Sequence, residues 1–156
     1  IILVELSSSR VHFAKKLVDL DLIINSSMED IPERIKEETE GRGVDKVIVA
    51  CSSGKAQEKS LKMIAPRGIV NFFGALPKDN PSIKFDSNLV HYGEFYVVGT
   101  HGSAPYHNEV ALNLLSGGRI KVKELISHRL SLEKLEEGIH LAESGEAMKI
   151  AVFSQK

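Results

Sequence analysis

Residues 44–75 read VDKVIVACSSGKAQEKSLKMIAPRGIVNFFGA. The β-branched run Lys46–Cys51 predicts a buried strand, and the stretch Ala56–Ile64 predicts a helix that the following Pro and Gly bring to an end. A second apolar run, Ile69–Phe73, predicts another strand, which breaks at Gly74. Because neither strand alternates apolar with polar residues, this strand–helix–strand unit is typical of a parallel sheet with both faces covered.

The same alternation of strand and helix patterns continues on both sides of this stretch. Further strands are expected at 1–6, 22–24, 95–98 and 149–153, and further helices at 11–18, 32–40, 88–91, 110–115 and 132–142. The chain is therefore predicted to be an α/β protein with a doubly wound parallel sheet. The alternation becomes less regular after Leu76, and we expect the first domain to span 1–100, with a C-terminal segment at 101–156.

Length and composition are those of one globular domain of 156 residues. The formal net charge of −1 argues against nucleic acid or an anionic membrane as the main partner. No apolar run approaches the roughly 18 residues that are needed to span a bilayer. A single cysteine, Cys51, excludes an internal disulfide and fits a reducing cytosol, so we expect a cytoplasmic protein.

An acidic residue, Glu5, ends the first predicted strand. In nucleotide-binding βαβ folds a carboxylate at this place hydrogen-bonds the ribose hydroxyls of the adenosine. Its charge would repel a 2′-phosphate, which favours NAD over NADP. Arg10 follows in the first turn of the next helix, where its guanidinium could lie over the adenine. The alternative is an ordinary strand-end carboxylate beside a solvated arginine.

Small residues follow the two central predicted strands: Cys51 and Ser52 after one, Gly74 and Ala75 after the other. Ligands of doubly wound sheets bind beyond the carboxyl ends of the strands, where small side chains let a cofactor approach the backbone. These loops are candidate binding elements, although any short connection between a strand and a helix gives the same pattern. We expect Cys51 to be a small core residue rather than a nucleophile, and residues 55–62 to form a solvated helix face.

Two nucleotide-binding motifs are absent from the sequence. No stretch fits G-x-G-x-x-G or G-x-x-x-x-G-K-[ST], so the pyrophosphate cradle of a dinucleotide domain is missing. The six histidines show no metal-binding spacing such as H-E-x-x-H. His101 and His107 lie in a segment with Gly, Ser and Pro, where they could reach a ligand, although most such histidines are only exposed polar residues.

Three segments of the chain carry a resemblance to a known family. They read GRGVDKVI at 41–48, APRGIVNFFG at 65–74 and SHRLSLE at 127–133. With their relative spacing, they resemble the zinc-containing medium-chain dehydrogenase/reductase family, in its sorbitol, threonine and alcohol dehydrogenase branch. The similarity covers essentially the whole chain.

The resemblance implies a Rossmann domain with strand order 3-2-1-4-5-6 and an NAD or NADP cofactor. It places Glu5 on the adenosine ribose and Arg10 beside the adenine. The residues that it places on the nicotinamide side are Phe73, Gly74, Ala75, Thr100 and His101. Several polyol dehydrogenases of the family carry an arginine after the equivalent of His101, whereas this chain has Gly102, so the resemblance does not fix the substrate.

By the same resemblance, residue 1 corresponds to the start of the second Rossmann strand. The first strand, its glycine-rich turn and the catalytic domain with its zinc ligands would lie upstream, and the missing initiator Met fits a chain that is part of something longer. We therefore expect an incomplete Rossmann-type sheet with a C-terminal helix and strand extension, which binds no zinc itself. Either its strands close the gap, or a partner chain fills it, or upstream residues do.

These expectations give a leading function and an alternative. The leading one is the cofactor-binding C-terminal part of an NAD-dependent zinc-type alcohol or polyol dehydrogenase, which transfers a hydride between nicotinamide and a secondary alcohol and is inactive as this chain alone. The alternative is a non-catalytic folded fragment that acts at most as an oligomeric scaffold. In either case we expect a homo-oligomer that forms through the strand Phe95–Val98, as family dimers do.

Overall fold

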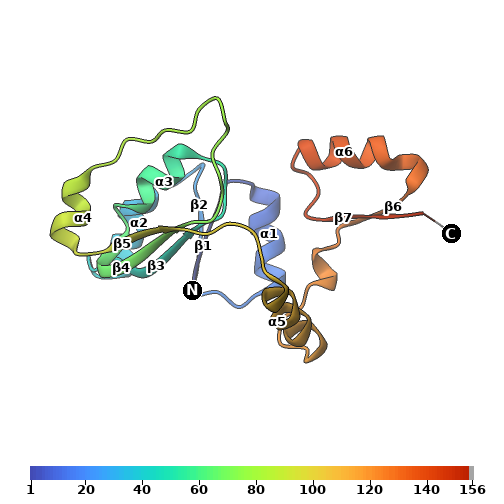
Figure 1. The fold of residues 1–156 in the computed structure, drawn as a ribbon, viewed down its shortest axis with the longest axis horizontal. Coiled ribbons are helices and arrows are strands. Elements are labelled where there is room, and N and C mark those ends of the chain that lie inside the picture. Colours follow the sequence, from blue (N-terminus) through green and yellow to red (C-terminus); the bar gives the residue numbers. More distant parts are fainter. Residues whose placement is uncertain (155–156) are drawn as a thin grey trace. The chain divides into compact units, whose positions relative to one another are not determined.

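The computed structural model describes residues 1–154, in which strands and helices alternate (Figure 1). The strands are β1 (Ile2–Glu5), β2 (Leu22–Asn25), β3 (Val44–Val49), β4 (Ile64–Phe72), β5 (Tyr96–Gly99), β6 (His128–Ser131) and β7 (Ile150–Phe153). The helices are α1 (Ser8–Leu17), α2 (Ile31–Glu38), α3 (Gly54–Ser60), α4 (Ser87–Gly93), α5 (Pro105–Ser116) and α6 (Leu135–Glu143), with short 3-10 turns at Lys123–Leu125 and Leu132–Lys134.

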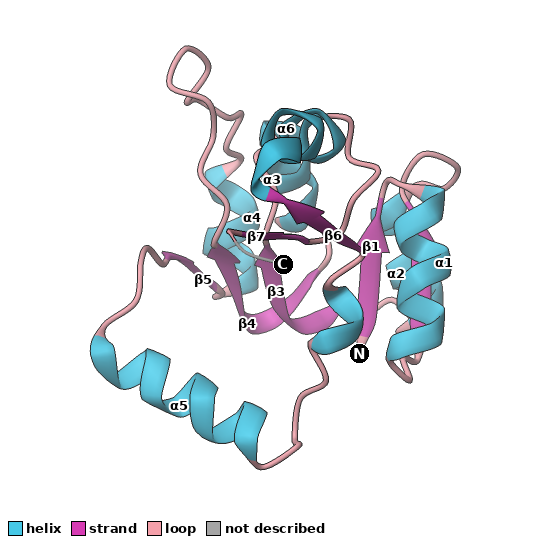
Figure 2. Cartoon of the chain, turned by 90° about the vertical axis from the view of Figure 1, so that its right-hand side faces the viewer, coloured by secondary structure: helices cyan, strands magenta, loops and turns pink. Residues whose placement is uncertain are grey.

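All pairings between the described strands are parallel, and helices connect the paired strands (Figure 2). The strands form three sheets, with the orders β1-β2, β3-β4-β5 and β6-β7. Parallel strands with helical crossovers confirm the predicted α/β fold. The chain divides into two compact units: residues 26–102, and residues 1–25 together with those from 103 onward.

The unit of residues 26–102 is built on the sheet β3-β4-β5. One face of this sheet carries the hydrophobic core, which is formed by Val49, Leu61, Val70 and Phe95 and is extended by Leu89 and Val90 of α4. The other face remains exposed at Ile48 and Tyr96. The two faces follow from the pleat, because successive residues of a strand point to opposite sides of the sheet.

The start of β4 differs from the sequence prediction. Helix α3 ends at Ser60, and Ile64 already belongs to the strand instead of the helix. The Val44 amide donates to the Met63 carbonyl, which draws this segment against β3. The register then shifts between Val44↔Ile64 and Lys46↔Ile69. The Pro and Gly that were expected to end a helix therefore lie in an irregularity within β4, which is where a strand tolerates such residues.

The unit that contains both ends of the chain has two βαβ elements. In the first, α1 connects β1 to β2, and the Ser7 side chain caps the helix by accepting from the Arg10 amide at 3.5 Å. In the second, α6 connects β6 to β7. The prediction missed β6, although His128 and Leu130 are more buried than their neighbours, which is the period of two expected of a strand.

Candidate functional site

A cavity of about 300 Å³ lies at the carboxyl ends of β4 and β5, in the unit of residues 26–102. The residues that line it are Gln57, Phe72, Phe73, Gly74, Ala75, Leu76, Pro81, Thr100 and His101. Five predicted site residues, at 73–75, 100 and 101, are therefore brought together. The parallel sheet explains this, because its strands all end at the same edge.

Gly74 lies where the chain leaves β4, pressed against the loop that follows β3. The amides of Phe73 and Gly74 both donate to the Val49 carbonyl, at 3.1 and 2.8 Å. A Cβ atom on Gly74 would lie 2.5 Å from the Cys51 carbonyl oxygen, which is closer than real Cβ contacts come. This position therefore requires glycine for space, and bare backbone forms part of the cavity wall.

Cys51 and Ser52 do not line the cavity. Strand β3 ends at Val49, two residues earlier than predicted, so Cys51 lies in the following bend and is exposed. The expectation of a small core cysteine is wrong for this reason. The Cys51 backbone lies against Gly74, and in this way it bounds the cavity wall from behind.

Gln57 is a cavity residue that the sequence prediction missed. It lies on α3, in the stretch that we expected to be solvated, but it is only 5% exposed. Its Nε2 donates to the Gly74 carbonyl at 3.2 Å. The available signal was helical spacing, because Gln57 shares a helix face with Ser60 and Leu61, both of which are buried.

The end of β5 is attached to β4 by two hydrogen bonds from Thr100. Its amide donates to the Phe72 carbonyl at 3.4 Å, and its Oγ1 donates to Asn71 Oδ1 at 3.2 Å. The next residue, His101, is exposed at the cavity. Thr100 thus fixes the part of the cavity rim that follows β5. His101 is the one residue of the cavity lining with an ionisable side chain.

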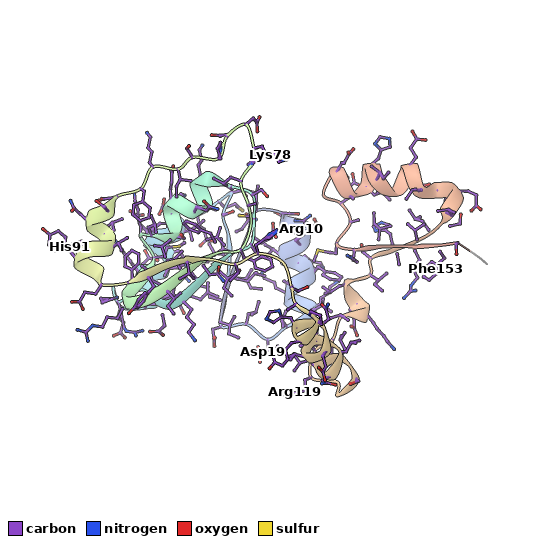
Figure 3. All side chains as sticks on the ribbon, in the orientation of Figure 1. Arg10, Asp19, Lys78, His91, Arg119 and Phe153 are labelled. Atoms are coloured by element: carbon purple, nitrogen blue, oxygen red, sulfur yellow. The ribbon has the colours of Figure 1, made fainter. Side chains whose placement is uncertain are left out.

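Glu5 and Arg10 belong to the other unit, where they lie near each other. Glu5 Oε1 accepts from the amides of Leu6 and Ser7, at 2.8 and 2.9 Å. Glu5 Oε2 is 4.0 Å from Arg10 Nη1, and Arg10 projects from α1 (Figure 3). The two backbone bonds hold the carboxylate at the end of β1, and its Oε2 faces Arg10.

No group of three or more His, Cys, Asp or Glu side chains within residues 1–154 is arranged to hold a metal ion. The described residues therefore do not fit a zinc site. The expectation that this chain binds no zinc stays a prediction. None of the helices in residues 1–154 is long and apolar enough to cross a membrane.

Known proteins are similar to this chain in sequence and in fold. It is 28% identical over 151 residues to the sorbitol dehydrogenase of Halalkalibacterium halodurans, covering 96% of this chain and 43% of that protein. It is 31% identical to the L-threonine 3-dehydrogenase of Pyrococcus furiosus, covering 100% and 44%. The chain thus spans less than half the length of these relatives.

Solved structures agree with this likeness. An alcohol dehydrogenase of Thermotoga maritima matches 97% of the chain and 42% of its own length, with a TM-score of 0.86 and 25% identity. A zinc-binding dehydrogenase of Sinorhizobium meliloti 1021, bound to NADP, matches 88% and 40%, with a TM-score of 0.79 and 24% identity. The fold is therefore the Rossmann-type one that the resemblance implied. Residues 1–117 match the model of the zinc-binding dehydrogenase family, and the chain belongs to that family.

Proposed function

We propose that this chain binds NAD(H) and positions its nicotinamide ring, as the C-terminal part of a zinc-type alcohol or polyol dehydrogenase. The observation that carries this proposal is the cavity at the carboxyl ends of β4 and β5, with bare backbone at Gly74. A glycine that cannot be replaced by a larger residue lets a ligand ring lie against the main chain. The nicotinamide supplies the hydride acceptor or donor when it is bound.

The residues at the cavity bind and orient the ring in this proposal. Phe73 and Ala75 offer apolar contact, and the Gly74 carbonyl is held by Gln57. Thr100 and His101, which follow β5, also line the cavity. Cys51 and Ser52 belong to the loop after β3, and the Cys51 backbone lies against Gly74 behind this wall. Together they limit the access of water to one face of the ring.

The adenosine end of the cofactor is assigned to Glu5 and Arg10. Two backbone amides hold Glu5 in place, and its Oε2 is available to accept from a ribose hydroxyl. The same carboxylate would repel a 2′-phosphate, so we propose NAD as the cofactor, although one related structure is bound to NADP. Arg10 then stacks on the adenine.

The substrate class is proposed from the relatives, whose names are those of sorbitol, L-threonine and alcohol dehydrogenases. We propose a secondary alcohol or polyol, and we propose that turnover requires a catalytic domain which residues 101–156 would contact. We further propose a cytoplasmic location. Substrate-dependent NADH formation by the purified chain would contradict the proposal that it is inactive alone.

The experiment that tests cofactor binding is a titration of the purified chain with NADH and with NADPH, followed by nicotinamide fluorescence and checked by calorimetry. We expect NADH to bind with a dissociation constant below about 100 μM, which is roughly −5.5 kcal/mol, and NADPH to bind more weakly. Failure to bind either nucleotide would refute the proposed function.

A second candidate function is that of an oligomeric scaffold without cofactor binding. It is favoured by β5, which is an edge strand of its sheet and exposes Tyr96 and Val98. Unpaired edge strands with apolar side chains pair readily with a second copy. A monomeric mass at micromolar concentration, measured by light scattering, would contradict this candidate and the proposed homo-oligomer alike.

A further inference from the structure

We propose that His107 is a pH-sensitive cap of helix α5. It closes the first turn of the helix when its imidazole is neutral and releases that turn when the imidazole is protonated. His107 lies at the third position of α5 and outside the lining of the candidate cofactor cavity. Its Nδ1 atom accepts a hydrogen bond from the backbone amide of Ala104, the residue that precedes the helix, at 2.9 Å. The role of His107 is therefore independent of cofactor binding.

Helix α5 begins without the usual side-chain acceptor at its N-cap. Ala104 occupies this position in an extended conformation, and its methyl group cannot accept a hydrogen bond. Pro105 follows and has no N–H group, which removes one donor that would need a partner. His107 supplies half of a capping box, in which the third helical residue bonds back to the N-cap amide. Among residues 103–108, this is the one bond between a side chain and a backbone amide.

The protonation state of His107 decides whether this bond exists. A neutral imidazole has one N–H group and one acceptor nitrogen, so the bond from Ala104 places the proton on Nε2. An imidazolium has an N–H group at both nitrogens and cannot accept. Because histidine changes its charge between about pH 5 and 8, acid should break the bond. A positive charge is also unfavourable at a helix N-terminus, which acts in the same direction.

No close packing replaces the lost bond. None of the residues of α5 is buried, and within residues 1–154 no other helix or strand packs closely against it. The ring of Tyr106 meets that of His107 edge-on, with the centroids 5.9 Å apart, and Glu109 is the next ionisable residue of the helix. In the same part of the chain, the histidine that pairs with a carboxylate is His140. No ion pair therefore holds a protonated His107 ring in place.

The first turn of α5 follows the point where the chain passes from one unit to the other. Residues 26–102 form one unit, and Ser103 begins the second stretch of the other. Gly102 has a left-handed backbone, with a φ of +67°, and a Cβ atom added to it would meet nothing within 4 Å. The connection is thus not held by packing at this residue. Release of the cap lengthens the connection, which runs from the end of β5 to the start of α5, by the first turn of the helix.

The experiment follows the isotope-labelled wild-type chain by NMR at about pH 8 and about pH 5. The measured quantity is the protection factor of the Ala104 amide, which is its intrinsic exchange rate at each pH divided by its observed rate. We expect this factor to be roughly 3- to 10-fold lower in acid, as the loss of one hydrogen bond implies. The amide order parameters of residues 106–108 should fall as well. Both changes should follow the titration of the His107 ring protons in the same spectra.

Three variants separate this bond from other effects of pH. His107→Gln keeps a side-chain acceptor that a capping box can use but that does not titrate, so the Ala104 amide should stay protected at both pH values. His107→Ala has no acceptor, and its amide should be poorly protected at both. His91→Gln is the matched control, because His91 of α4 is exposed and meets Tyr92 edge-on, as His107 meets Tyr106. It should respond to pH as the wild type does.

Three results would overturn the proposal. The first is equal protection of the Ala104 amide at both pH values in the wild type. The second is a pH response that persists in His107→Gln or His107→Ala, because another group would then cause it. His107 is exposed, so neither substitution disturbs the packed core. The third is a wild-type response that vanishes in about 0.5 M NaCl, since salt screens the helix dipole and leaves a lost hydrogen bond unrestored.

Discussion

Arg67 and Glu94 form an ion pair, with Arg67 Nε 2.9 Å from Glu94 Oε2, and both residues have left-handed backbones. Their φ angles are +62° and +50°. Arg67 lies in the irregular part of β4, and Glu94 ends α4 as its C-terminal cap. Such conformations are costly for residues other than glycine, while a highly exposed pair of this kind contributes little stability.

Glu94→Gly should therefore stabilise the protein. The glycine relieves the left-handed strain at the helix end, which is worth about 1 kcal/mol, and this exceeds the contribution of the exposed ion pair. Urea denaturation would measure the free energy of unfolding. Glu94→Gln, which loses the charge but keeps the strain, is the control and should lie within about 0.5 kcal/mol of the wild type. A Glu94→Gly protein less stable than Glu94→Gln would contradict the argument.

Gly74→Ala should both destabilise the fold and remove cofactor binding. The new methyl group meets the Cys51 backbone, which cannot move as a flexible side chain would, so we expect a loss of roughly 1–3 kcal/mol. The matched control is Gly99→Ala at the end of β5, where the nearest atom to an added Cβ is the Phe72 carbonyl oxygen at 3.9 Å. Thermal unfolding and NADH titration of both variants test this. Equal effects of the two substitutions would show that space at Gly74 is not the constraint.

Glu5→Gln should weaken the preference for NADH over NADPH. The amide oxygen can still accept from the amides of Leu6 and Ser7, but the charge that repels the 2′-phosphate is gone. We expect the ratio of the two dissociation constants to fall about tenfold, as removal of roughly 1.4 kcal/mol of repulsion implies. Asp19→Asn removes an exposed charge of the same unit and should leave the ratio unchanged. An unchanged ratio in Glu5→Gln would remove Glu5 from the ribose site.

The Arg42 guanidinium hydrogen-bonds Asp45 and lowers the pKa of that carboxyl. Arg42→Ala should raise the pKa of Asp45 toward its ordinary value. A lowered folded-state pKa stabilises the protein above the unfolded-state pKa, and this contribution is lost as the pH falls through the folded-state pKa. Carbon-13 NMR of the Asp45 carboxyl would follow the change. Lys78→Ala, on the loop after β4 (Figure 3), is the control, and a wild-type pKa for Asp45 in Arg42→Ala would contradict the assignment.

Sequence periodicity predicted the fold well where a local signal matched the final environment. The helix expected at 32–40 is α2, which begins one residue earlier, and Asp30 caps it by accepting from the Glu33 amide. The apolar runs of β3 and β5 likewise lie within a residue or two of their predicted places. In these cases the same residues determine both the local conformation and the burial.

Prediction failed where a distant contact determined the local structure. Read alone, Pro66 and Gly68 indicate the end of a helix. Pairing with β3 instead keeps both residues within strand β4. Gln57 appears solvated by its chemistry, and only its bond to Gly74, seventeen residues away, shows why it is buried. The cavity itself could be inferred from the small residues at the strand ends, but its one buried amide could not.

The division into two units has a consequence for synthesis. Residues 26–102 form their unit from one continuous stretch, whereas residues 1–25 belong with residues from 103 onward. A chain that emerges from the ribosome carries all of the continuous unit before the second half of the other has been made. Because domains fold as units during translation, the sheet β3-β4-β5 with the cavity should form first. The unit that contains β1, α1 and β2 can be completed only after its C-terminal residues have been synthesised.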